Sequence, residues 1–254
     1  MTRQQHRRFN YVTYIVGGFI VLNIVWYLAY IILNIKALPS PFDVYSSYPT
    51  AIEDGIFTHS LASLRRIAIS LGISLLIAIT LGLWMGYKPK VNRVLGPMVY
   101  FSYPIPKLAL LPIIMVLFDI GETSKIIVVV LIVVFQLIIT IRDAVTNIPH
   151  EHYHVLTSFG ASGLQKMRYI TLPAILPELL SSLRVALGII TSVLFFIETF
   201  GTDEGLGYYI TDAQNKVNYL QMYFGIIVLS LIGFVLFLII DLIDSIVCSW
   251  KYNS

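Results

Sequence analysis

Charged residues and cysteine are both scarce in this chain of 254 residues. Only 12% of the residues are Asp, Glu, Lys or Arg while 57% are hydrophobic, which excludes an ordinary water-soluble fold. The single cysteine, Cys248, excludes an intrachain disulfide and a cluster of thiolates around a metal. The sequence also lacks Gly-x-x-x-x-Gly-Lys-Ser/Thr, so it supplies no phosphate-binding loop of its own.

Long hydrophobic runs take up most of the chain. Several reach the roughly 20 residues that an α-helix needs to cross about 30 Å of hydrocarbon. They are too continuous for the alternating strands of a membrane barrel, and a segment in lipid must satisfy its own backbone hydrogen bonds. We therefore expect an all-α membrane protein with about six transmembrane helices, at residues 11–34, 63–86, 94–118, 125–141, 173–200 and 219–247.

The positions of Lys and Arg predict the orientation of these helices, because cytoplasmic flanks carry an excess of basic residues. An N-terminus inside the cell places ten basic residues in the cytoplasm: Arg3, Arg7, Arg8, Lys88, Lys90, Arg93, Arg142, Lys166, Arg168 and Lys251. Five are then outside: Lys36, Arg65, Arg66, Lys125 and Lys216. This favours cytoplasmic N- and C-termini, although Arg65 and Arg66 oppose it.

The first run is too long for a signal peptide and lacks a small-residue cleavage site, so we expect a retained helix.

Proline is concentrated in the third hydrophobic run, at Pro97, Pro104, Pro106 and Pro112. Proline removes an amide donor and clashes with the preceding turn, so this helix must be kinked or broken. Lipid tolerates a break only where neighbouring protein supplies hydrogen-bond partners. We expect a segment in the centre of the bundle, either at a pathway through the membrane or at a packing kink.

Glycines at a spacing of four mark the second run. Gly82 and Gly86 form a pair of small residues of the kind that lets two membrane helices approach closely. The pattern is common, so it predicts a contact and no particular function.

Ionisable residues within the hydrophobic runs are costly in lipid and therefore serve as functional candidates. Lys107, in the broken third run, could meet an anionic solute or pair with a carboxylate. Glu198, near the outer end of the fifth run, could line an outer vestibule or a gate, or lie at the membrane interface. Arg184 could extend its stem to the cytoplasmic interface, and Asp241 and Asp244 are expected at the inner end of the last helix.

A polar stretch of about 30 residues, 147–177, is too long for a simple turn. Pro149 suits the first turn of a helix, and Gly160 suits the left-handed residue that ends one. Ser162 followed by Gln165 is typical of a capping box, which opens a second helix that we expect to stop before Pro173. Two short helices joined by a glycine bend are therefore predicted. They carry apolar and basic side chains together, which favours docking to a cytoplasmic partner: Val155, Leu156, Phe159, Leu164, Lys166, Met167 and Arg168.

This stretch resembles the cytoplasmic motif of the permeases of ATP-binding-cassette (ABC) importers. The motif is Glu-Ala-Ala, three residues, Gly, nine residues, Ile, one residue and Leu-Pro; its second half matches Gly160, Ile170, Leu172 and Pro173, with Ala161 after the glycine. The first half departs from the motif, since the Glu falls on His154 and the alanines on Val155 and Leu156. Further stretches look like the nitrate, sulfonate and taurine class of these permeases: residues 38–41, 59–65, 104–112, 121–125 and 205–207.

The resemblance implies the type I importer permease fold, with residues 1–254 as a single transmembrane permease domain and a cytoplasmic coupling helix pair between helices 4 and 5. It implies a bacterial inner-membrane subunit that forms a dimer and transports a small solute, anionic or heterocyclic. The expected partners are a second permease copy, two cytoplasmic ATPases and an extracytoplasmic substrate-binding protein, with no nucleic acid, cofactor or metal. The residues that the resemblance implies for coupling to the ATPase are Glu151, His154, Val155, Leu156, Phe159, Gly160, Ala161, Ile170, Leu172 and Pro173. Among them, Glu151 or protonated His154 could replace the Glu that the motif has and this chain lacks. The candidate pathway or gate residues are Pro104, Lys107 and Glu198.

A rival motif lies in the same polar stretch. Residues His150, Glu151 and His154 fit His-Glu-x-x-His, in which two histidines on one helix face bind zinc and the Glu acts as a general base. This would make the chain an intramembrane zinc metalloprotease, but no convincing third ligand is found. A secondary transporter or channel is a further alternative. Secondary transporters usually contain inverted repeats, and we find no internal duplication in this sequence, which argues against that alternative.

Overall fold

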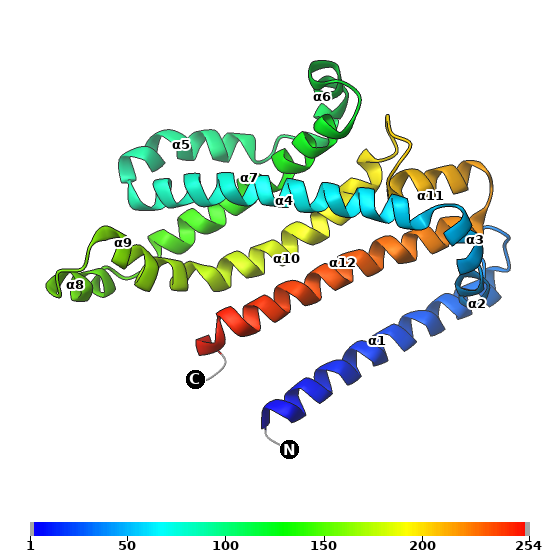
Figure 1. Cartoon of the computed structure of the whole chain (residues 1–254), viewed down its shortest axis with the longest axis horizontal. Helices are drawn as coiled ribbons and strands as arrows, with labels where there is room; N and C mark the ends of the chain where they lie inside the picture. Colours follow the sequence, from blue (N-terminus) through cyan, green and yellow to red (C-terminus); the bar gives the residue numbers. More distant parts are fainter. Residues whose placement is uncertain (1–2, 252–254) are drawn as a thin grey trace. The chain divides into compact units, whose positions relative to one another are not determined.

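The computed structural model describes residues 3–251, and within them the side chains of residues 13–250. All regular structure in this part of the chain is helical (Figure 1). The α-helices are α1 (Arg3–Leu33), α2 (Pro41–Ser46), α3 (Tyr48–Glu53), α4 (Ile56–Tyr87), α5 (Pro89–Ser102), α6 (Leu111–Phe118), α7 (Glu122–Thr146), α8 (His150–Ser158), α9 (Gly163–Lys166), α10 (Leu172–Ile197), α11 (Leu206–Asn215) and α12 (Tyr219–Val247). Short 3₁₀ turns occupy Lys107–Leu110 and Ser249–Lys251, and a π-helical turn occupies Met167–Thr171.

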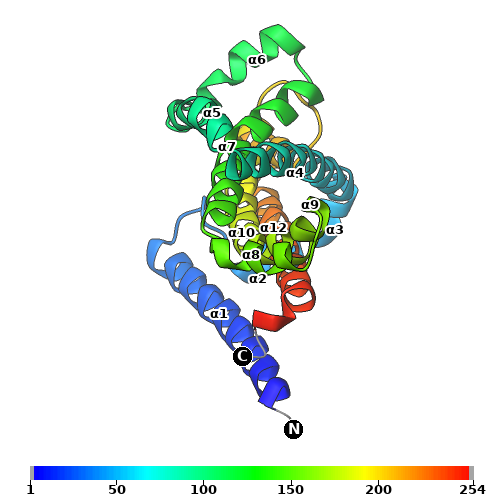
Figure 2. The ribbon, with the colours of Figure 1, turned by 90° about the vertical axis from the view of Figure 1, so that its left-hand side faces the viewer.

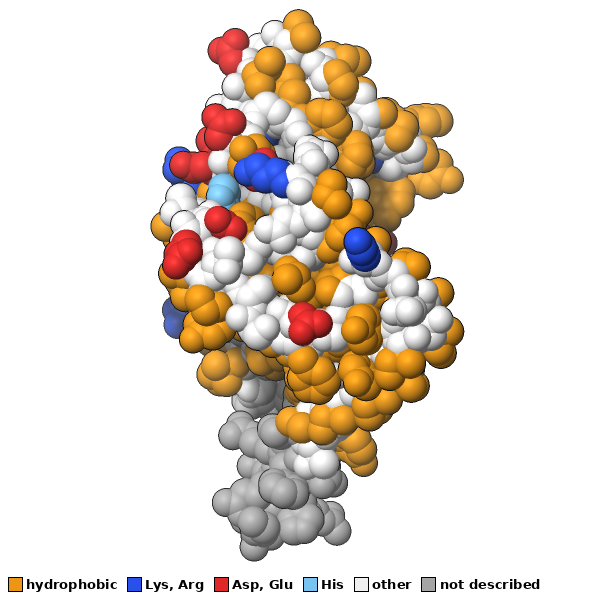
Figure 3. Space-filling model, turned by 90° about the vertical axis from the view of Figure 1, so that its right-hand side faces the viewer, with side chains coloured by type: hydrophobic (Ala, Val, Ile, Leu, Met, Phe, Trp, Pro, Cys, Tyr) orange, Lys and Arg blue, Asp and Glu red, His pale blue; other side chains and the backbone are white. Residues whose placement is uncertain are grey.

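Five helices of the described chain are long and apolar enough to cross a membrane: Thr13–Leu33, Ile56–Tyr87, Glu122–Thr146, Gly163–Ile197 and Tyr219–Val247. The bent pair Pro89–Ser102 and Lys107–Phe118 raises the number to six if it is one span. The all-α membrane fold with about six spans is therefore confirmed. Hydrophobic side chains also spread widely over the face seen in Figure 3, as expected of a surface that meets lipid.

The third span is broken where its prolines predicted. Its two halves bend by 81° at the residues between α5 and the 3₁₀ turn, where Pro104 and Pro106 lie. Figure 2 shows α6 turning away from the direction of α5. Pro97 is accommodated inside α5, whereas Pro112 lies in the first turn of α6, where its missing amide costs nothing.

The chain divides into two compact units, and the smaller consists of Met1–Phe57 with Tyr209–Ile227. Aromatic and polar contacts hold it together. The ring of Trp26 stacks on Tyr223 at 5.5 Å between centroids, and the Tyr209 hydroxyl donates to Oε1 of Gln221 at 2.6 Å. Burial raises the pKa of Tyr209 above that of a free phenol, and the nearby charge of Asp54 adds to the shift.

The larger unit consists of Thr58–Tyr208 with Val228–Ser254, and its core is the contact between α7 and α10. The two helices lie side by side and run in opposite directions (Figure 1). Fully buried aliphatic side chains line the contact: Val128, Val133, Leu137 and Ile141 from α7, with Ile175, Leu187, Ile190 and Leu194 from α10. Membrane helices gain stability from such close packing rather than from hydrophobic exclusion of water.

The glycine pair of α4 lies directly against α7. A Cβ atom on Gly82 would meet Cβ of Ile141 at 2.7 Å, and one on Gly86 would meet Cβ of Val145 at 2.6 Å. Both separations are too short for any side chain. The close helix approach predicted from the spacing of these glycines is therefore confirmed.

A cluster of four charged residues joins α4, α7 and the end of α10; we call Arg66, Glu122, Lys125 and Glu198 the charge cluster. Nη1 of Arg66 donates to Oε1 of Glu198 at 2.6 Å, and Nε donates to both carboxylate oxygens of Glu122 at 3.0 Å. Arg66 is 1% exposed, so it is a buried and paired charge within the cluster.

The surroundings of the charge cluster complete its hydrogen bonds. The amide N–H of Gly207 and the hydroxyl of Ser63 donate to Oε2 of Glu198 at 2.9 and 2.8 Å. The amine of Lys125 donates to the carbonyl oxygens of Gly121 and Gly201 at 3.2 and 2.9 Å. Such complete pairing is what makes buried charges tolerable.

A second charged group ties α10 to α12. Arg184 donates through Nε to Asp241 at 2.5 Å and through Nη2 to Asp244 at 2.9 Å. Arg184 is thus held by two carboxylates of the last helix and remains partly exposed.

We predict that Gly82→Ala destabilises the chain, because one added methyl forces α4 away from Ile141 and overpacking costs about 1–3 kcal/mol. Thermal unfolding of the detergent-purified protein measures the effect. Gly72→Ala on the same helix is the matched control: nothing lies within 4 Å of its new Cβ, and alanine favours a helix over glycine. Equal melting temperatures for the two variants would contradict the close α4–α7 contact.

We further predict that Arg66→Met lowers the stability by about 3–5 kcal/mol, because it leaves Glu198 buried without its charged partner. The double variant Arg66→Met with Glu198→Leu recovers most of this loss, since no lone buried charge remains. Arg65→Met, at an exposed neighbouring position, is the control and leaves the melting temperature unchanged. A double variant as unstable as Arg66→Met alone would show that the ion pair is not the cause.

Candidate functional site

The polar stretch forms the predicted pair of short helices, α8 and α9, which we call the helix pair. α8 begins directly after Pro149, and Gly160 follows it with φ of +73°, the left-handed conformation that glycine adopts without strain. Both bonds of the capping box are present: the Ser162 hydroxyl accepts from the Gln165 amide at 3.3 Å, and the Gln165 side chain accepts from the Ser162 amide at 2.7 Å. The glycine bend and the capping box are confirmed.

The second helix does not stop before Pro173, which corrects the sequence prediction. It passes through the π-helical turn Met167–Thr171 directly into α10, so that Gly163–Ile197 is one continuous span. Pro173 falls in the first turn of α10, where a proline needs no amide partner. α9 is therefore continuous with a membrane helix, and the bend at Gly160 joins it to α8.

A hydrogen-bonded hydroxyl group fastens α8 to the bundle. Thr171 is fully buried, and its hydroxyl contacts the hydroxyl of Tyr153 at 2.9 Å and that of Tyr87 at the end of α4. Three segments of the chain thus meet at one buried threonine. This contact therefore links α8 to both α4 and the start of α10.

The helix pair presents large apolar side chains to solvent. Phe159 is 85% exposed, Leu164 75% and Val155 56%. Exposed apolar groups of this size within a polar element make this surface a candidate interaction site.

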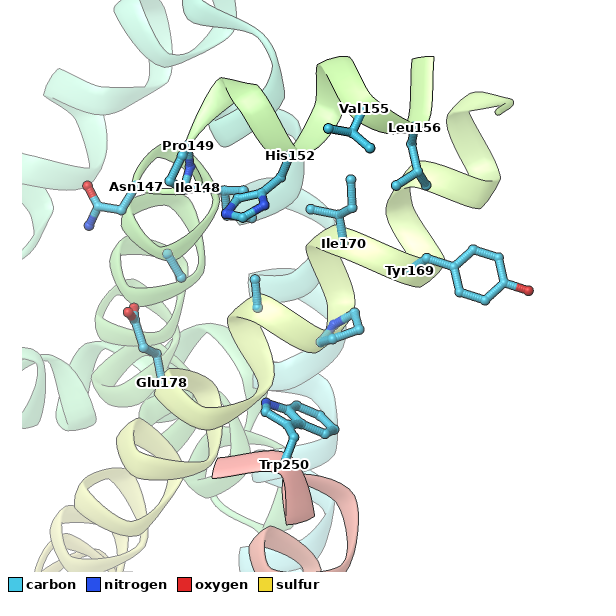
Figure 4. Close-up of a pocket in the computed structure, with 13 residues that line it drawn as sticks. Asn147, Ile148, Pro149, His152, Val155, Leu156, Tyr169, Ile170, Glu178 and Trp250 are labelled. Carbon is cyan, nitrogen blue, oxygen red and sulfur yellow. The ribbon is translucent and has the colours of Figure 1, made fainter. Parts of the chain in front are cut away.

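A groove of about 730 Å³ lies between α8, the start of α10 and the C-terminal turn (Figure 4). Four of the predicted coupling residues line it: Val155, Leu156, Ile170 and Pro173. His152, Tyr169, Glu178 and Trp250 line it as well, and the sequence argument had not selected them. Glu151, His154, Phe159 and Leu172 are exposed outside this lining, and Ala161 is partly buried.

The histidines of α8 do not form a metal site. Within residues 3–251 no three His, Cys, Asp or Glu side chains lie close enough together to hold a metal ion. His150, Glu151 and His154 are all exposed on a short surface helix. The zinc protease alternative therefore has no support in the structure.

The candidate pathway residues fall in two different places. Glu198 is completely buried in the charge cluster, at the end of α10 remote from the helix pair. Pro104 lines a second groove, which lies between α5 and α7 and has a volume of about 570 Å³. Lys107 lies nearby, with its amine 2.5 Å from the carbonyl oxygen of Tyr103 and 5.2 Å from the centre of the Phe135 ring.

The sequence argument missed Arg66 and Lys125 as buried groups. A signal was available, because Ser63, Arg66, Ser70 and Ser74 recur at helical spacing on one face of α4, and all four are buried. Three of the stretches that resemble the permease family also meet in the charge cluster: residues 59–65, 121–125 and 205–207.

Curated relatives match nearly the whole chain. The taurine transport system permease protein TauC of Escherichia coli is 31% identical over 233 residues, covering 89% of this chain and 85% of TauC. The formylaminopyrimidine transport permease protein ThiX of Halalkalibacterium halodurans is 29% identical, covering 92% of this chain and 94% of ThiX. The aliphatic sulfonates transport permease protein SsuC of Bacillus subtilis is 24% identical, covering 87% of this chain and 80% of SsuC.

Solved structures share the fold at lower identity. A chain of a bacterial ABC transporter involved in the import of alginate superimposes with a TM-score of 0.64 at 16% identity, covering 94% of this chain and 98% of that one. A chain of the MetNI methionine ABC transporter gives 0.59 at 17% identity, covering 76% of this chain and 94% of that one. Residues 78–247 match the family model described as the binding-protein-dependent transport system inner membrane component. The chain belongs to this family, the permease subunits of ABC importers, and within it to the taurine, sulfonate and nitrate class.

Proposed function

We propose that this chain is the membrane-spanning permease of an ATP-driven importer and that the helix pair couples it to cytoplasmic ATPase subunits. The observation that carries the proposal is an exposed apolar knob, Val155, Phe159 and Leu164, on a helix pair whose second helix continues into a transmembrane helix. An exposed knob suits the groove of a partner, and a continuous helix suits the transmission of a movement.

The hydrogen bonds that attach α8 to the bundle provide a route by which its movement would reach the membrane helices. Thr171 links α8 to α4 and α10, so a displacement of the helix pair tilts these helices as rigid bodies instead of bending a loop. The chain brings no phosphate-binding loop, so the energy of ATP must come from the partner. We therefore assign it a transport role without an active site of its own.

The family description supplies the remaining partners of the proposal. A binding-protein-dependent system implies an extracytoplasmic substrate-binding protein, and we propose a second copy of the permease as the other half of the pathway. We also propose that residues 1–254 act as one permease domain in the bacterial inner membrane, with the N- and C-termini and the helix pair in the cytoplasm.

The cargo is proposed from the relatives. TauC and SsuC are named for taurine and aliphatic sulfonates, which carry a sulfonate group, while ThiX is named for a pyrimidine. A small sulfonate or related anion is therefore the first cargo to test, and a small heterocycle is the second.

We predict that Gly160→Val uncouples ATP hydrolysis from uptake, because a β-branched residue at φ +73° costs about 1–2 kcal/mol and distorts the bend between the helices. The permease is reconstituted with its ATPases and binding protein in proteoliposomes, and uptake of labelled taurine, ethanesulfonate and nitrate is measured per ATP hydrolysed. We expect this ratio to fall several-fold while membrane insertion is unchanged.

Gly163→Val is the matched control for this experiment. Gly163 lies three residues away at the start of α9, has no positive φ, and leaves open space around an added Cβ. It should preserve the ratio of uptake to hydrolysis. Normal coupling in Gly160→Val would remove the bend from the mechanism.

A further inference from the structure

The groove between α5 and α7 sets several polar groups into a largely apolar lining. Five of its eight lining residues carry a polar group: Tyr100, Tyr103, Gln136, Thr140 and Arg142; Val99, Pro104 and Ile139 complete it. Gln136 and Thr140 lie well inside the 25-residue span α7. Polar residues within membrane spans that face a cavity mark the paths of polar solutes.

The polar groups of the groove have unused hydrogen-bonding capacity. Among the described residues, the Gln136 side chain has no hydrogen-bond partner, although it can donate two hydrogen bonds and accept two more. The Thr140 hydroxyl donates to Ser182 Oγ at 3.1 Å, which leaves its oxygen free to accept. An unused amide is expensive in a bilayer and is explained if a ligand pairs with it during transport.

The charge around the groove is positive. Arg142 lines the groove. Its Nε and Nη2 lie 2.8 and 2.7 Å from Oδ1 of Asp143, while its Nη1 has no partner among the described residues. Lys107 adds a second cation beside Tyr103. No acidic residue belongs to the lining, so the groove favours an anion over a cation.

We infer that this groove is a binding site for a small anion on the transport pathway, with Gln136 and Arg142 as its main contacts. The inference rests on the proposed function and adds a place in the chain where its anionic cargo would bind. A lipid chain would fit a groove of this volume, but it would leave the Gln136 amide and the Nη1 group of Arg142 without hydrogen-bond partners. The volume of about 570 Å³ exceeds what an ion of a few heavy atoms needs, so water enters with it.

A pair of charged thiol reagents tests the inference without knowledge of the cargo. Ile139→Cys, in a Cys248→Ala background, places one thiol in the groove at a side chain that is not a proposed contact. Membrane vesicles that contain the full chain are treated with anionic sulfonatoethyl or cationic trimethylammonioethyl methanethiosulfonate. Leu76→Cys, an exposed position on α4, is the control for a thiol outside the groove, and Val99→Cys is a second reporter if the first does not fold.

The expected result is that the anionic reagent reacts about tenfold faster than the cationic one, relative to a free thiol, because a positive groove concentrates anions. Arg142→Gln and Gln136→Leu should each reduce this preference, while Leu76→Cys stays unreactive. An unreactive groove thiol would mean that lipid or a second chain fills the groove. Faster reaction with the cationic reagent would mean that the groove attracts cations instead of anions. Either result overturns the inference. Because the assay needs neither ATP nor partner subunits, its outcome is separate from that of the coupling experiment.

Discussion

The contact between α7 and α10 is the feature on which the rest of the structure depends. Each helix carries part of the charge cluster at one end and joins the helix pair at the other. A helix of 25 residues is about 37 Å long, so the two places are separated by roughly the thickness of a membrane. Buried aliphatic side chains fill the whole length of the contact, so the two helices are closely packed from one end to the other.

The buried charges at the far end make this contact specific rather than merely tight. Burying Arg66, Lys125 and Glu198 costs several kcal/mol for each ion before pairing, and hydrophobic residues of similar size would pack at less cost. Their pairing, however, fixes the register of α4, α7 and α10 at that end. A bundle that moves as rigid bodies needs such fixed points, because lipid by itself gives adjacent helices no register.

Local features of the chain could be predicted from its sequence. The six hydrophobic runs, the break at Pro104 and Pro106, the left-handed Gly160 and the capping box at Ser162 all depend on residues close together in the chain. The failure at Pro173 has the same local origin, because proline either ends a helix or begins one, and the choice depends on the preceding π-helical turn.

Long-range partners could not be predicted from the sequence. Arg66 finds Glu122 56 residues away and Glu198 132 residues away, and only the packed fold shows that all three are buried. The same holds for the residues that line the two grooves. His152 and Trp250 lie about 100 positions apart, and no local pattern would join them (Figure 4). Hydrophobic patterning thus predicted the membrane fold, and the residues of the candidate sites depended on tertiary structure.

The most direct test of the account is the side of the membrane on which the helix pair lies. Phe159→Cys, in a Cys248→Ala background, gives a thiol at the most exposed apolar position of the knob. A membrane-impermeant maleimide should label it in inside-out vesicles, not in intact cells, and less when the ATPase subunits are bound. Labelling from the outside of intact cells would place the knob away from ATP and contradict the proposed coupling.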